Sequence, residues 1–257
     1  MIAASAIIHP DARIDEGVAI DAYAMVGAQV EIRKGTWIGP HTVITGPTRI
    51  GKDNRIFQFC SIGADPQDKK FHGEPDSFLE IGDGNTIREF CTINRGTGDG
   101  GGITRLGDNN WIMAYVHIAH DCHVGSYTVF ANNATLAGHV QVEDYVILGG
   151  FTGVHQFCRI GQYCFTAIAS VVVKDIPPYI IVSGNGAKPS GLNKEGLKRH
   201  KFSAATVKLL RQAYKIVYRE GLVLKEALQR LQPLADECEE VACFAKFIAA
   251  SDRGIVR

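Results

Sequence analysis

Histidine is the residue in this 257-residue chain whose type and placement most directly suggest chemistry. Five histidines fall in one stretch: His117, His120, His123, His139 and His155. A neutral imidazole, with an ordinary pKa near 6.5, can take a proton from a hydroxyl group and so act as a general base. Imidazoles from neighbouring subunits can instead bind zinc. Either chemistry needs a scaffold that brings distant histidines together.

That scaffold is indicated by an aliphatic residue that recurs every six positions. The rhythm holds over residues 8–62, resumes over 81–93 and runs again over 106–172, where only Phe130 and Thr166 depart from Leu, Ile or Val. A period of six cannot be one face of a long α-helix, because a helical turn contains 3.6 residues. Short β-segments joined by tight corners, each with its aliphatic side chain inward, account for the rhythm.

Three such hexads predict one triangular coil of 18 residues. About 25 hexads then give about eight coils, a prism roughly 40 Å tall at about 4.8 Å between stacked strands. A single coil cannot bury its own apolar face, so stacking supplies the stability. We therefore expect residues 1–190 to form an all-β main domain, a parallel β-helix of hexapeptide repeats.

The same geometry predicts where three of the histidines lie. The position stacked on His120 is 138, one residue from His139, and the position stacked on His139 is 157, two residues from His155. These three side chains should therefore line roughly one edge of the prism. A column of imidazoles favours a functional site over isolated structural histidines.

Most of the cysteines fit the repeat and need no chemical role. Five of the seven follow a repeat aliphatic by four positions, where a small inward side chain is expected: Cys60, Cys91, Cys122, Cys158 and Cys164. Free cysteine commonly behaves as a small buried hydrophobe. We expect these five to be core residues rather than metal ligands or nucleophiles.

Two breaks in the rhythm predict loops inserted near residues 63–80 and 94–105. The first is polar and carries Gln67, Asp68 and Lys70. The second is glycine-rich but lacks the Gly-Lys-Ser/Thr sequence of a phosphate-binding P-loop. Loops on a rigid scaffold commonly carry function, so both are candidates for the site.

Residues 191–257 show helical spacing and predict a small C-terminal α-helical domain. A first helix should begin at the N-cap Ser203 and stop at Gly221, a second should end at Pro233, and a third should bury Phe244. These helices follow the last coil of the repeat.

Composition excludes several classes of protein. With 27 basic and 27 acidic residues the net charge is +0, so the global basic field of a nucleic-acid binder is absent. The stretch Lys188–Lys201 is locally basic, either as a solvated helix face or as a landing site for an acidic partner or a phosphate. Neither a signal peptide nor a run of about 20 apolar residues is present. We expect a soluble, cytoplasmic protein without a transmembrane segment.

Together these features resemble the UDP-N-acetylglucosamine 3-O-acyltransferase family, whose members catalyse the first step of lipid A synthesis in Gram-negative bacteria. The resemblance covers essentially the whole chain. It rests on the hexad repeat followed, in this order, by Gln67-x-x-Lys70, Ile118-Ala119-His120-Asp121-Cys122, Ala137-Gly138-His139, His155-Gln156-Phe157 and Asn193-x-Glu195-Gly196-Leu197-Lys198-Arg199.

The resemblance implies a left-handed β-helix that forms a homotrimer with active sites between subunits. It implies transfer of a 3-hydroxyacyl chain from acyl carrier protein, an acidic partner, to the glucosamine 3-hydroxyl of UDP-N-acetylglucosamine. It implies neither a cofactor nor a metal. A thioester donor is already activated, so a base, an oxyanion donor and correct positioning suffice.

The resemblance also implies roles for individual residues. His120 resembles the general base, and the backbone N–H of Gly138 matches the group that stabilises the oxyanion. Positions that match substrate contacts are Gln67, Asp68, Lys70, His117, His139, His155 and Gln156. Positions that match groups near the uridine and phosphates are Asn193, Glu195 and Arg199.

Two residues depart from the family pattern. His200 stands where a second arginine is common, which puts one phosphate contact in doubt. Ile168 stands where some members have glycine at the floor of the acyl groove, as an acyl-chain ruler. A branched side chain there should shorten the groove, so we predict a shorter preferred acyl chain than in the glycine-bearing members.

Three other functions are open to a β-helix of this kind. A zinc carbonic anhydrase of the β-helix type uses a His-x₄-His pair, whereas residue 122 is cysteine and His117 and His120 are three apart. A structural or ice-binding β-helix needs flat threonine faces. The related N-acyltransferase of the same pathway typically carries an extra domain before its repeat, whereas here the first repeat aliphatic is Ile8. The acyl length, and whether the sugar's 3-position bears a hydroxyl or an amine, are not given by the sequence.

Overall fold

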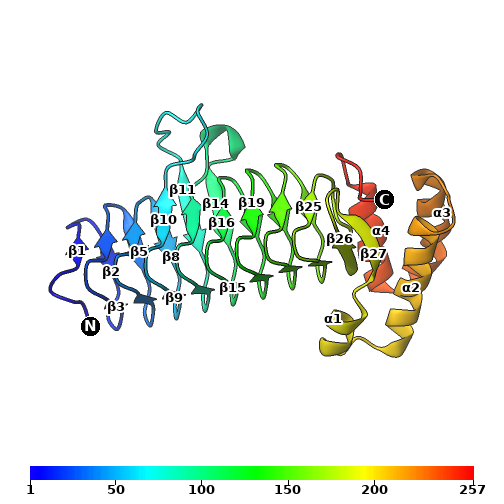
Figure 1. Cartoon of the computed structure of the whole chain (residues 1–257), viewed down its shortest axis with the longest axis horizontal. Helices are drawn as coiled ribbons and strands as arrows, with labels where there is room; N and C mark the ends of the chain where they lie inside the picture. The colour runs from blue at the N-terminus through cyan, green and yellow to red at the C-terminus, as the bar shows by residue number, and fades with distance from the viewer.

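The computed structural model describes all residues, 1–257, and its main part is a left-handed parallel β-helix, as the hexad rhythm and the family resemblance predict. Figure 1 shows the coils stacked along the long axis, with the N-terminus at one end and the helices at the other. Each coil contributes one short strand to each of three parallel sheets. No helix is long and apolar enough to cross a membrane.

We name the sheets after their first strands. The β1 sheet has nine strands: β1 (Ile7–Ile8), β4 (Met25–Val26), β7 (Val43–Ile44), β10 (Ser61–Ala64), β13 (Thr92–Asn94), β16 (His117–Ile118), β19 (Thr135–Leu136), β22 (Gly153–Val154) and β25 (Val171–Val172). The β2 sheet has eight: β2 (Arg13–Ile14), β5 (Val30–Ile32), β8 (Thr48–Ile50), β11 (Phe78–Ile81), β14 (Ile103–Leu106), β17 (His123–Val124), β20 (Gln141–Val142) and β23 (Arg159–Ile160).

The β3 sheet has ten strands: β3 (Ala19–Ile20), β6 (Trp37–Ile38), β9 (Arg55–Ile56), β12 (Thr86–Ile87), β15 (Trp111–Ile112), β18 (Val129–Phe130), β21 (Ile147–Leu148), β24 (Phe165–Thr166), β26 (Ile180–Ser183) and β27 (Lys188–Leu192). All neighbours are parallel except β26 and β27, which form an antiparallel hairpin at the end of the prism.

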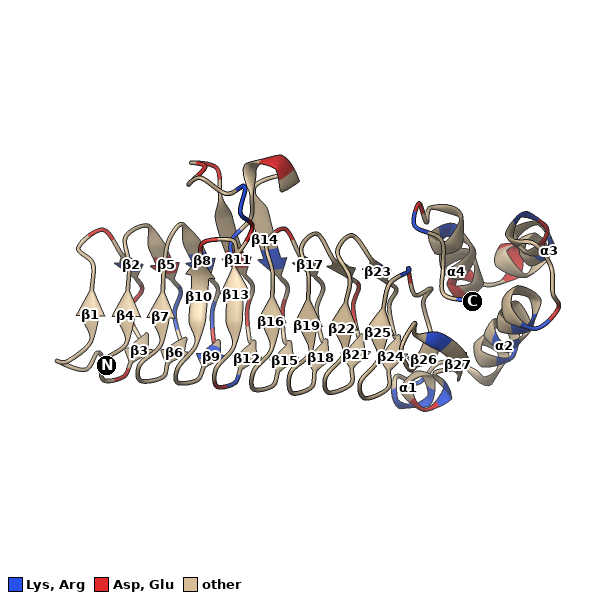
Figure 2. Cartoon of the chain, turned by 45° about the horizontal axis from the view of Figure 1, so that its top comes forward, with Lys and Arg blue, Asp and Glu red and all other residues tan.

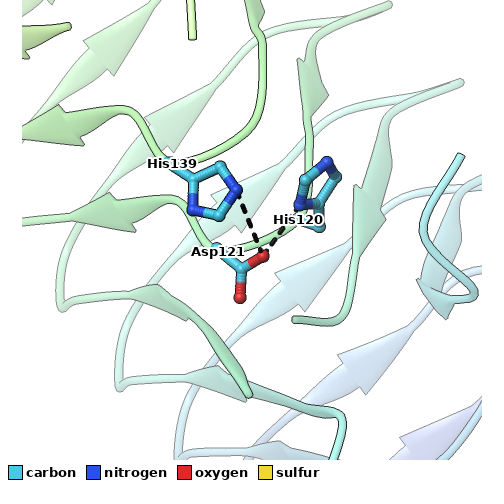
Figure 3. Close-up of side chains that lie close together, drawn as sticks. All are labelled: His120, Asp121 and His139. Carbon is cyan, nitrogen blue, oxygen red and sulfur yellow. Dashed lines mark hydrogen bonds and ion pairs between the residues drawn. The ribbon is translucent and has the colours of Figure 1, made fainter. Parts of the chain in front are cut away.

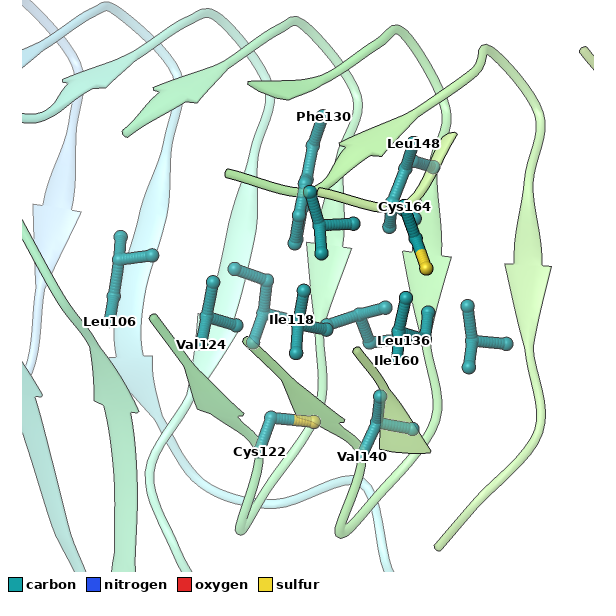
Figure 4. Packing of buried hydrophobic residues seen from close by; sticks show 14 of the residues in the cluster. Leu106, Ile118, Cys122, Val124, Phe130, Leu136, Val140, Leu148, Ile160 and Cys164 are labelled. Carbon is teal, nitrogen blue, oxygen red and sulfur yellow. The ribbon is translucent and has the colours of Figure 1, made fainter. Parts of the chain in front are cut away.

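The repeat aliphatics form one continuous core along the axis of the prism. Ile118, Leu136 and Val154 stack in register in the β1 sheet, and their side chains are almost completely buried. Figure 4 shows such side chains pointing inward from all three walls. The five cysteines expected in the core are buried, which confirms that prediction. At about 1.5–3 kcal/mol for each buried aliphatic side chain, this stack is a large gross driving force.

The corners of the prism have a recurring backbone conformation. The chain turns through a residue with positive φ, and Asp121 (φ 58°), His139 (φ 61°) and Phe157 (φ 64°) hold that position in three successive coils. Asp, Asn and His tolerate the left-handed region better than most side chains. We call the turns from the β1 sheet to the β2 sheet at residues 119–122, 137–140 and 155–158 the histidine corner.

Both predicted insertions leave the prism at this same edge. The first connects β10 to β11 and the second connects β13 to β14, so each also leads from the β1 sheet to the β2 sheet. The second contains a short 3₁₀ turn, η1 (Gly98–Gly100). Figure 1 shows the two insertions standing side by side off the prism. They therefore lie next to the histidine corner.

The C-terminal part contains α1 (Lys194–Arg199), α2 (Ala204–Tyr218), α3 (Leu224–Glu237) and α4 (Glu239–Ala249). Ser203 caps α2 as predicted, because its side chain accepts a hydrogen bond from the N–H of Thr206. The predicted end of the second helix at Pro233 is wrong, since α3 continues past it. Proline in a helix interior removes one hydrogen bond and crowds the carbonyl four residues earlier, at a cost of about 3 kcal/mol, and burial of Leu231 against the helical core helps to offset that cost.

Candidate active site

The histidine corner brings His120 and a buried carboxylate together. His120 Nδ1 lies 2.8 Å from Asp121 Oδ2, with 15% of the His120 side chain and none of the Asp121 side chain exposed. Figure 3 shows the pair, with His139 beside it. Because the carboxylate can only accept, Nδ1 is the protonated nitrogen and Nε2 keeps a free lone pair. The pair therefore has the arrangement of a general base oriented by a carboxylate.

The glycine-rich insertion holds Asp121 in place. Thr97 donates two hydrogen bonds to it, from its backbone N–H to Oδ1 (3.0 Å) and from its hydroxyl to Oδ2 (2.7 Å). A Cβ atom on Gly100 would lie 2.2 Å from the Asp121 carboxyl carbon, so a residue without a side chain is required there. This close approach explains at least one glycine of the cluster.

Those contacts determine the charge of Asp121. Burial alone would raise the pKa of its carboxyl group, but hydrogen bonds from His120 and Thr97 outweigh burial and keep the pKa below its ordinary value. The carboxylate therefore stays ionised at neutral pH and can stabilise an imidazolium on His120.

Gly138 lies directly against the His120 ring. A Cβ atom at this position would come within 2.6 Å of Cε1 and 2.7 Å of Nε2, so any side chain would displace the imidazole. The Gly138 carbonyl accepts from the N–H of Phe157, whereas its own N–H has no partner within the protein. A free backbone donor thus lies next to the base.

His139 completes the cluster. The spacing of the repeat suggested that His155 would be the next ring in the stack, but it does not stack on His139. The His139 ring meets His120 edge-on at 5.1 Å and stacks on Phe157 at 4.4 Å. His155 occupies the same corner one coil later, but its ring is exposed, and its Nδ1 lies 3.3 Å from Arg253 Nη2. Phe157 takes the stacking position because it has the same left-handed corner backbone as His139.

The remaining histidines of the stretch differ in surroundings. His117 lies on β16 with its Nδ1 2.7 Å from the Thr92 hydroxyl, and burial, with a smaller effect of His120, lowers its pKa. Burial likewise lowers the pKa of His139, although the Asp121 carboxylate opposes it. Both rings are therefore neutral at pH 7. His123 lies exposed on β17.

A cleft of about 480 Å³ opens between this corner and the two insertions. It is lined by residues of the first insertion (Asp68, Lys70, Phe71 and Glu74), of the second (Thr97, Asp99 and Gly100) and of the corner (His120, His139, Gln156 and Phe157). The structure thus unites five of the expected site residues, Asp68, Lys70, His120, His139 and Gln156. Gln67 is exposed and does not line the cleft.

Arg95, in the second insertion, holds the first insertion in place beside the cleft through its contacts with Asp65 and Phe71. Its guanidinium lies 2.6 Å from Asp65 Oδ1, faces the Phe71 ring at 5.5 Å and donates to the carbonyl of Gly46. The neighbouring Asn94 amide donates to the carbonyl of Asp65 at 2.8 Å. These contacts connect the loop that carries Asp68 and Lys70 to the segment that leads into Thr97.

The residues expected near the uridine and phosphates lie elsewhere in the chain, on α1. Asn193 caps α1 by accepting from the N–H of Gly196 and donates to the carbonyl of Tyr163, while Glu195 and Arg199 are exposed. This segment adjoins the corner between the β2 and β3 sheets, where the His200 ring packs against Tyr145 and Tyr163. A single chain does not bring these residues to His120.

Ile168 lies on the third edge of the prism, in the turn from β24 to β25. Its side chain is 71% exposed. It lines none of the five main pockets of the single chain, so a role in measuring an acyl chain requires a second subunit against this edge.

His120, Asp121 and His139 also have the spacing of a metal site, since their ligand atoms lie within 4.8 Å of one another. However, Asp121 Oδ2 already accepts hydrogen bonds from His120 and Thr97, and Oδ1 accepts from Thr97. This donor arrangement favours a hydrogen-bonded base over a metal centre.

Asp121 and Thr97 belong to the candidate site by their contacts with His120 and with each other, and the sequence predicted no role for either. Asp121 belongs to a recognised motif, and its position directly after His120 was the available signal. Thr97 gave none, because its contact with Asp121 joins residues 24 apart through an irregular loop.

Comparisons with known proteins agree over the whole chain. Residues 175–256 match the family model described as Udp N-acetylglucosamine O-acyltransferase, domain 2, and residues 103–138 match bacterial transferase hexapeptide, six repeats. The chain is 56% identical over 253 residues to the acyl-[acyl-carrier-protein]–UDP-N-acetylglucosamine O-acyltransferase of Thiobacillus denitrificans, with 98% of each chain covered. It is 53% identical over 261 residues to the enzyme of the same name from Herminiimonas arsenicoxydans, with 100% of this chain and 99% of the relative covered.

Solved structures show the same likeness. The UDP-N-acetylglucosamine O-acyltransferase of Moraxella catarrhalis superimposes with a TM-score of 0.97 at 47% identity, covering 100% of this chain and 99% of the other. The carbonic anhydrase alternative is not favoured by these matches.

Proposed function

The chain belongs to the acyl-[acyl-carrier-protein]–UDP-N-acetylglucosamine O-acyltransferase family, and from that premise we propose how its residues carry out acyl transfer to UDP-N-acetylglucosamine. It is an acyltransferase whose donor is an acyl thioester on acyl carrier protein. We propose a 3-hydroxyacyl chain as the group transferred, the glucosamine 3-hydroxyl as the acceptor, and the first step of lipid A synthesis, in the cytoplasm, as the pathway position.

The observation that carries the mechanism is the His120–Asp121 pair beside the free N–H of Gly138. His120 Nε2 takes the proton of the sugar hydroxyl as its oxygen attacks the thioester carbonyl carbon. The new C–O bond leaves a tetrahedral oxyanion, to which the Gly138 N–H donates. The C–S bond then breaks, and the imidazolium returns the proton to the departing thiolate. Nothing is bonded covalently to the enzyme.

The cleft supports assignment of the acceptor sugar to this site. Asp68, Lys70, His139 and Gln156 present polar groups around His120, and Phe157 provides an apolar surface. We propose that His117 and His155 act at the margins of this site, His117 from β16 and His155 from the corner. Gln67 is also proposed as a substrate contact, and in a single chain it is exposed outside the cleft.

The surface of the prism supports the proposed homotrimer. Outward positions of the β1 sheet carry no Asp, Glu, Lys or Arg: they are apolar near its two ends (Ile7, Met25, Val43 and Val171) and polar or small between them (Ser61, Thr92, His117, Thr135 and Gly153). Those of the β3 sheet are mostly apolar (Trp37, Trp111, Ile147 and Phe165), with Arg55 and Thr86 among the exceptions. Outward positions of the β2 sheet are mostly charged (Arg13, Glu31, Arg49, Glu80, Arg105 and Arg159), with His123 and Gln141 as the exceptions. Exposed stacked rings, including Phe59, Phe90 and Tyr115, line the edge between the β1 and β3 sheets. Such a surface favours burial by other copies.

A ring of three chains in which each β1 sheet meets the next chain's β3 sheet buries both of these faces and leaves the charged β2 sheet outward. The outer rim of that contact joins one chain's histidine corner to its neighbour's corner between the β2 and β3 sheets. The neighbour's α1 lies at that second corner. We therefore propose that Asn193, Glu195 and Arg199 reach the uridine and phosphates from the adjacent subunit.

We propose that the basic stretch Lys188–Lys201 is the docking site for acyl carrier protein. Figure 2 shows Lys and Arg gathered on β27 and α1 at the C-terminal end of the prism. Lys194 and Lys198 border a pocket of about 450 Å³ that continues onto Lys208 and Arg211 of α2. Positive potential of this kind steers an acidic partner.

Ile168 is proposed as the acyl-chain ruler. In the trimer its edge faces a neighbouring chain, and a branched side chain there closes the groove earlier than glycine would. The expected result for Ile168→Gly, assayed with a series of acyl carrier protein thioesters, is a shift of preference to longer chains. An unchanged preference contradicts the assignment.

The reaction itself is tested by incubating the enzyme with UDP-N-acetylglucosamine and a panel of 3-hydroxyacyl carrier proteins, with products identified by mass. We expect a single acyl addition to the sugar nucleotide. Acylation of a 3-amino sugar nucleotide but not of UDP-N-acetylglucosamine would show that the acceptor is wrong.

A further inference from the structure

A second pocket, of about 490 Å³, adjoins the catalytic cleft on the side of the β2 sheet. It shares Gly100, His139 and Phe157 with the cleft and is closed at its far side by the segment that follows α4, including Arg253. The acyl-transfer mechanism uses no residue on that far side. The pocket is therefore continuous with the active site but has no role so far.

Two arginines of this pocket have no carboxylate partner. The Arg159 guanidinium lies over the Phe247 ring at 4.6 Å and donates to the carbonyl of Ala250 at 3.1 Å, which fixes its position. Arg253 Nη2 lies 3.3 Å from His155 Nδ1. Neither guanidinium is within 4.0 Å of a carboxylate oxygen, in contrast to Arg33, Arg49 and Arg105 of the same face.

The acidic groups around the pocket are largely engaged elsewhere. The Asp121 carboxylate accepts hydrogen bonds from His120 and Thr97. Asp175 is 1% exposed and accepts from the Ser251 hydroxyl (2.7 Å) and the N–H of Arg159 (2.8 Å). Asp252 is the exposed carboxylate on the rim, and His123 faces the pocket from β17. Two guanidinium groups with donors to spare define a site for a phosphate-bearing ligand.

We propose that this pocket binds the phosphodiester of the donor's 4′-phosphopantetheine arm, through Arg159 and Arg253. The inference rests on the proposed function, which supplies a donor whose thioester is joined by a flexible chain to a phosphodiester. The acceptor's phosphates already have proposed partners on α1, whereas the donor's phosphate has none. Because the β2 sheet is the charged face that the proposed trimer leaves outward, the arm can enter from solvent and place its thioester beside His120.

The test compares donors that differ only in the phosphate. Arg159→Gln and Arg253→Gln are assayed with an acyl 4′-phosphopantetheine and with the acyl thioester of N-acetylcysteamine, which lacks the phosphate. Arg105→Gln is the matched control, since Arg105 lies on the same face and is paired with Glu80. Thermal melting checks folding, and Arg253, being exposed, provides a variant that leaves the Arg159–Phe247 contact intact.

We expect each of the two variants to raise KM for the phosphopantetheine donor roughly 10-fold, as expected for loss of one charge-assisted hydrogen bond. KM for UDP-N-acetylglucosamine and turnover of the N-acetylcysteamine donor should stay within twofold of wild type, as should all values for Arg105→Gln. Equal losses with both donors would reduce the two arginines to a structural role. A rise in KM for UDP-N-acetylglucosamine alone would assign them to the acceptor. Either result, or no change, overturns the proposal.

The experiments distinguish an error in the proposed phosphate subsite from an error in the proposed function. If wild-type enzyme transfers no acyl group to UDP-N-acetylglucosamine from any donor, the proposed function fails. Calorimetric titration with 4′-phosphopantetheine then still tests the pocket directly. Binding that both variants weaken supports the subsite, and binding that neither weakens overturns it.

Discussion

At the scale of single residues, the site depends on one imidazole whose two nitrogens have different surroundings. Nδ1 of His120 is held by Asp121, and Nε2 is left free beside Gly138. The sequence predicted that His120, Gly138 and His139 lie close together, because motif and coil register both pointed to them, and the structure places them in contact. The sequence did not predict that Asp121 is the hydrogen-bond partner of His120 Nδ1, because adjacency in sequence does not tell whether two side chains face each other. The position of Phe157 in place of His155 depends on which corner residue takes the left-handed backbone.

The first prediction concerns Asp121 and pH. Because the pKa of its carboxyl group is below the ordinary value in the folded protein, Asp121 contributes stability that is present above the unfolded value of about 3.9 and is lost as pH falls through the folded value. Asp121→Asn should therefore melt at a lower temperature than wild type at pH 7, by the equivalent of roughly 1.5–3 kcal/mol. That difference should shrink below about pH 4. A difference that is constant from pH 7 to pH 3, at fixed protein concentration, contradicts the account.

At the scale of elements, the coils were predictable and the insertions were not. Short strands that each bury a repeat aliphatic leave little choice of register, so the hexad count places the strands from β1 to β25, whereas the hairpin of β26 and β27 lies beyond it. The insertions have no repeat, and their arrangement depends on contacts such as those of Arg95, which joins Gly46, Asp65 and Phe71 from separate segments. Pro233 shows the converse limit, because tertiary packing overrides a local helix-breaking signal.

The second prediction belongs to this scale. Arg95→Ala should free the first insertion, and with it Asp68 and Lys70, so KM for UDP-N-acetylglucosamine should rise roughly 10-fold while kcat changes less. Arg95→Lys should recover only part of the loss, because lysine lacks the planar fork of donors. Arg49→Ala, which removes an exposed ion pair with Glu31, is the control and should behave as wild type. A KM for Arg95→Ala within twofold of wild type would refute the role of Arg95.

At the scale of the whole molecule, the uneven distribution of apolar and charged surface matters most. A prism with two faces of low charge and one charged face fits a closed ring of copies, and the separation of α1 from His120 within one chain fits an active site shared between copies. Neither feature is readable from the repeat alone. Both depend on which side chains the coils turn outward and on where α1 docks at the end of the prism.

A third prediction follows for mixed assemblies. His120→Ala and Arg199→Ala should each be nearly inactive alone, but co-expression should restore about a quarter of wild-type activity. Each active site needs a chain with wild-type His120 and a neighbouring chain with wild-type Arg199. In a random mixture of the two variants each requirement is met in about half of the cases, so about a quarter of the sites are complete. Activity no higher than that of either variant alone would contradict a shared site. Co-expression of Arg199→Ala with a tagged copy of itself is the control.

The most direct test of the central assignment is the turnover of His120→Ala with acyl carrier protein thioester and UDP-N-acetylglucosamine. Loss of a general base should lower kcat by about 10²–10⁴-fold, with KM for both substrates and the melting temperature close to wild type. If the variant instead retains more than a tenth of wild-type kcat, the proton of the sugar hydroxyl is taken by another group and the proposed mechanism is wrong.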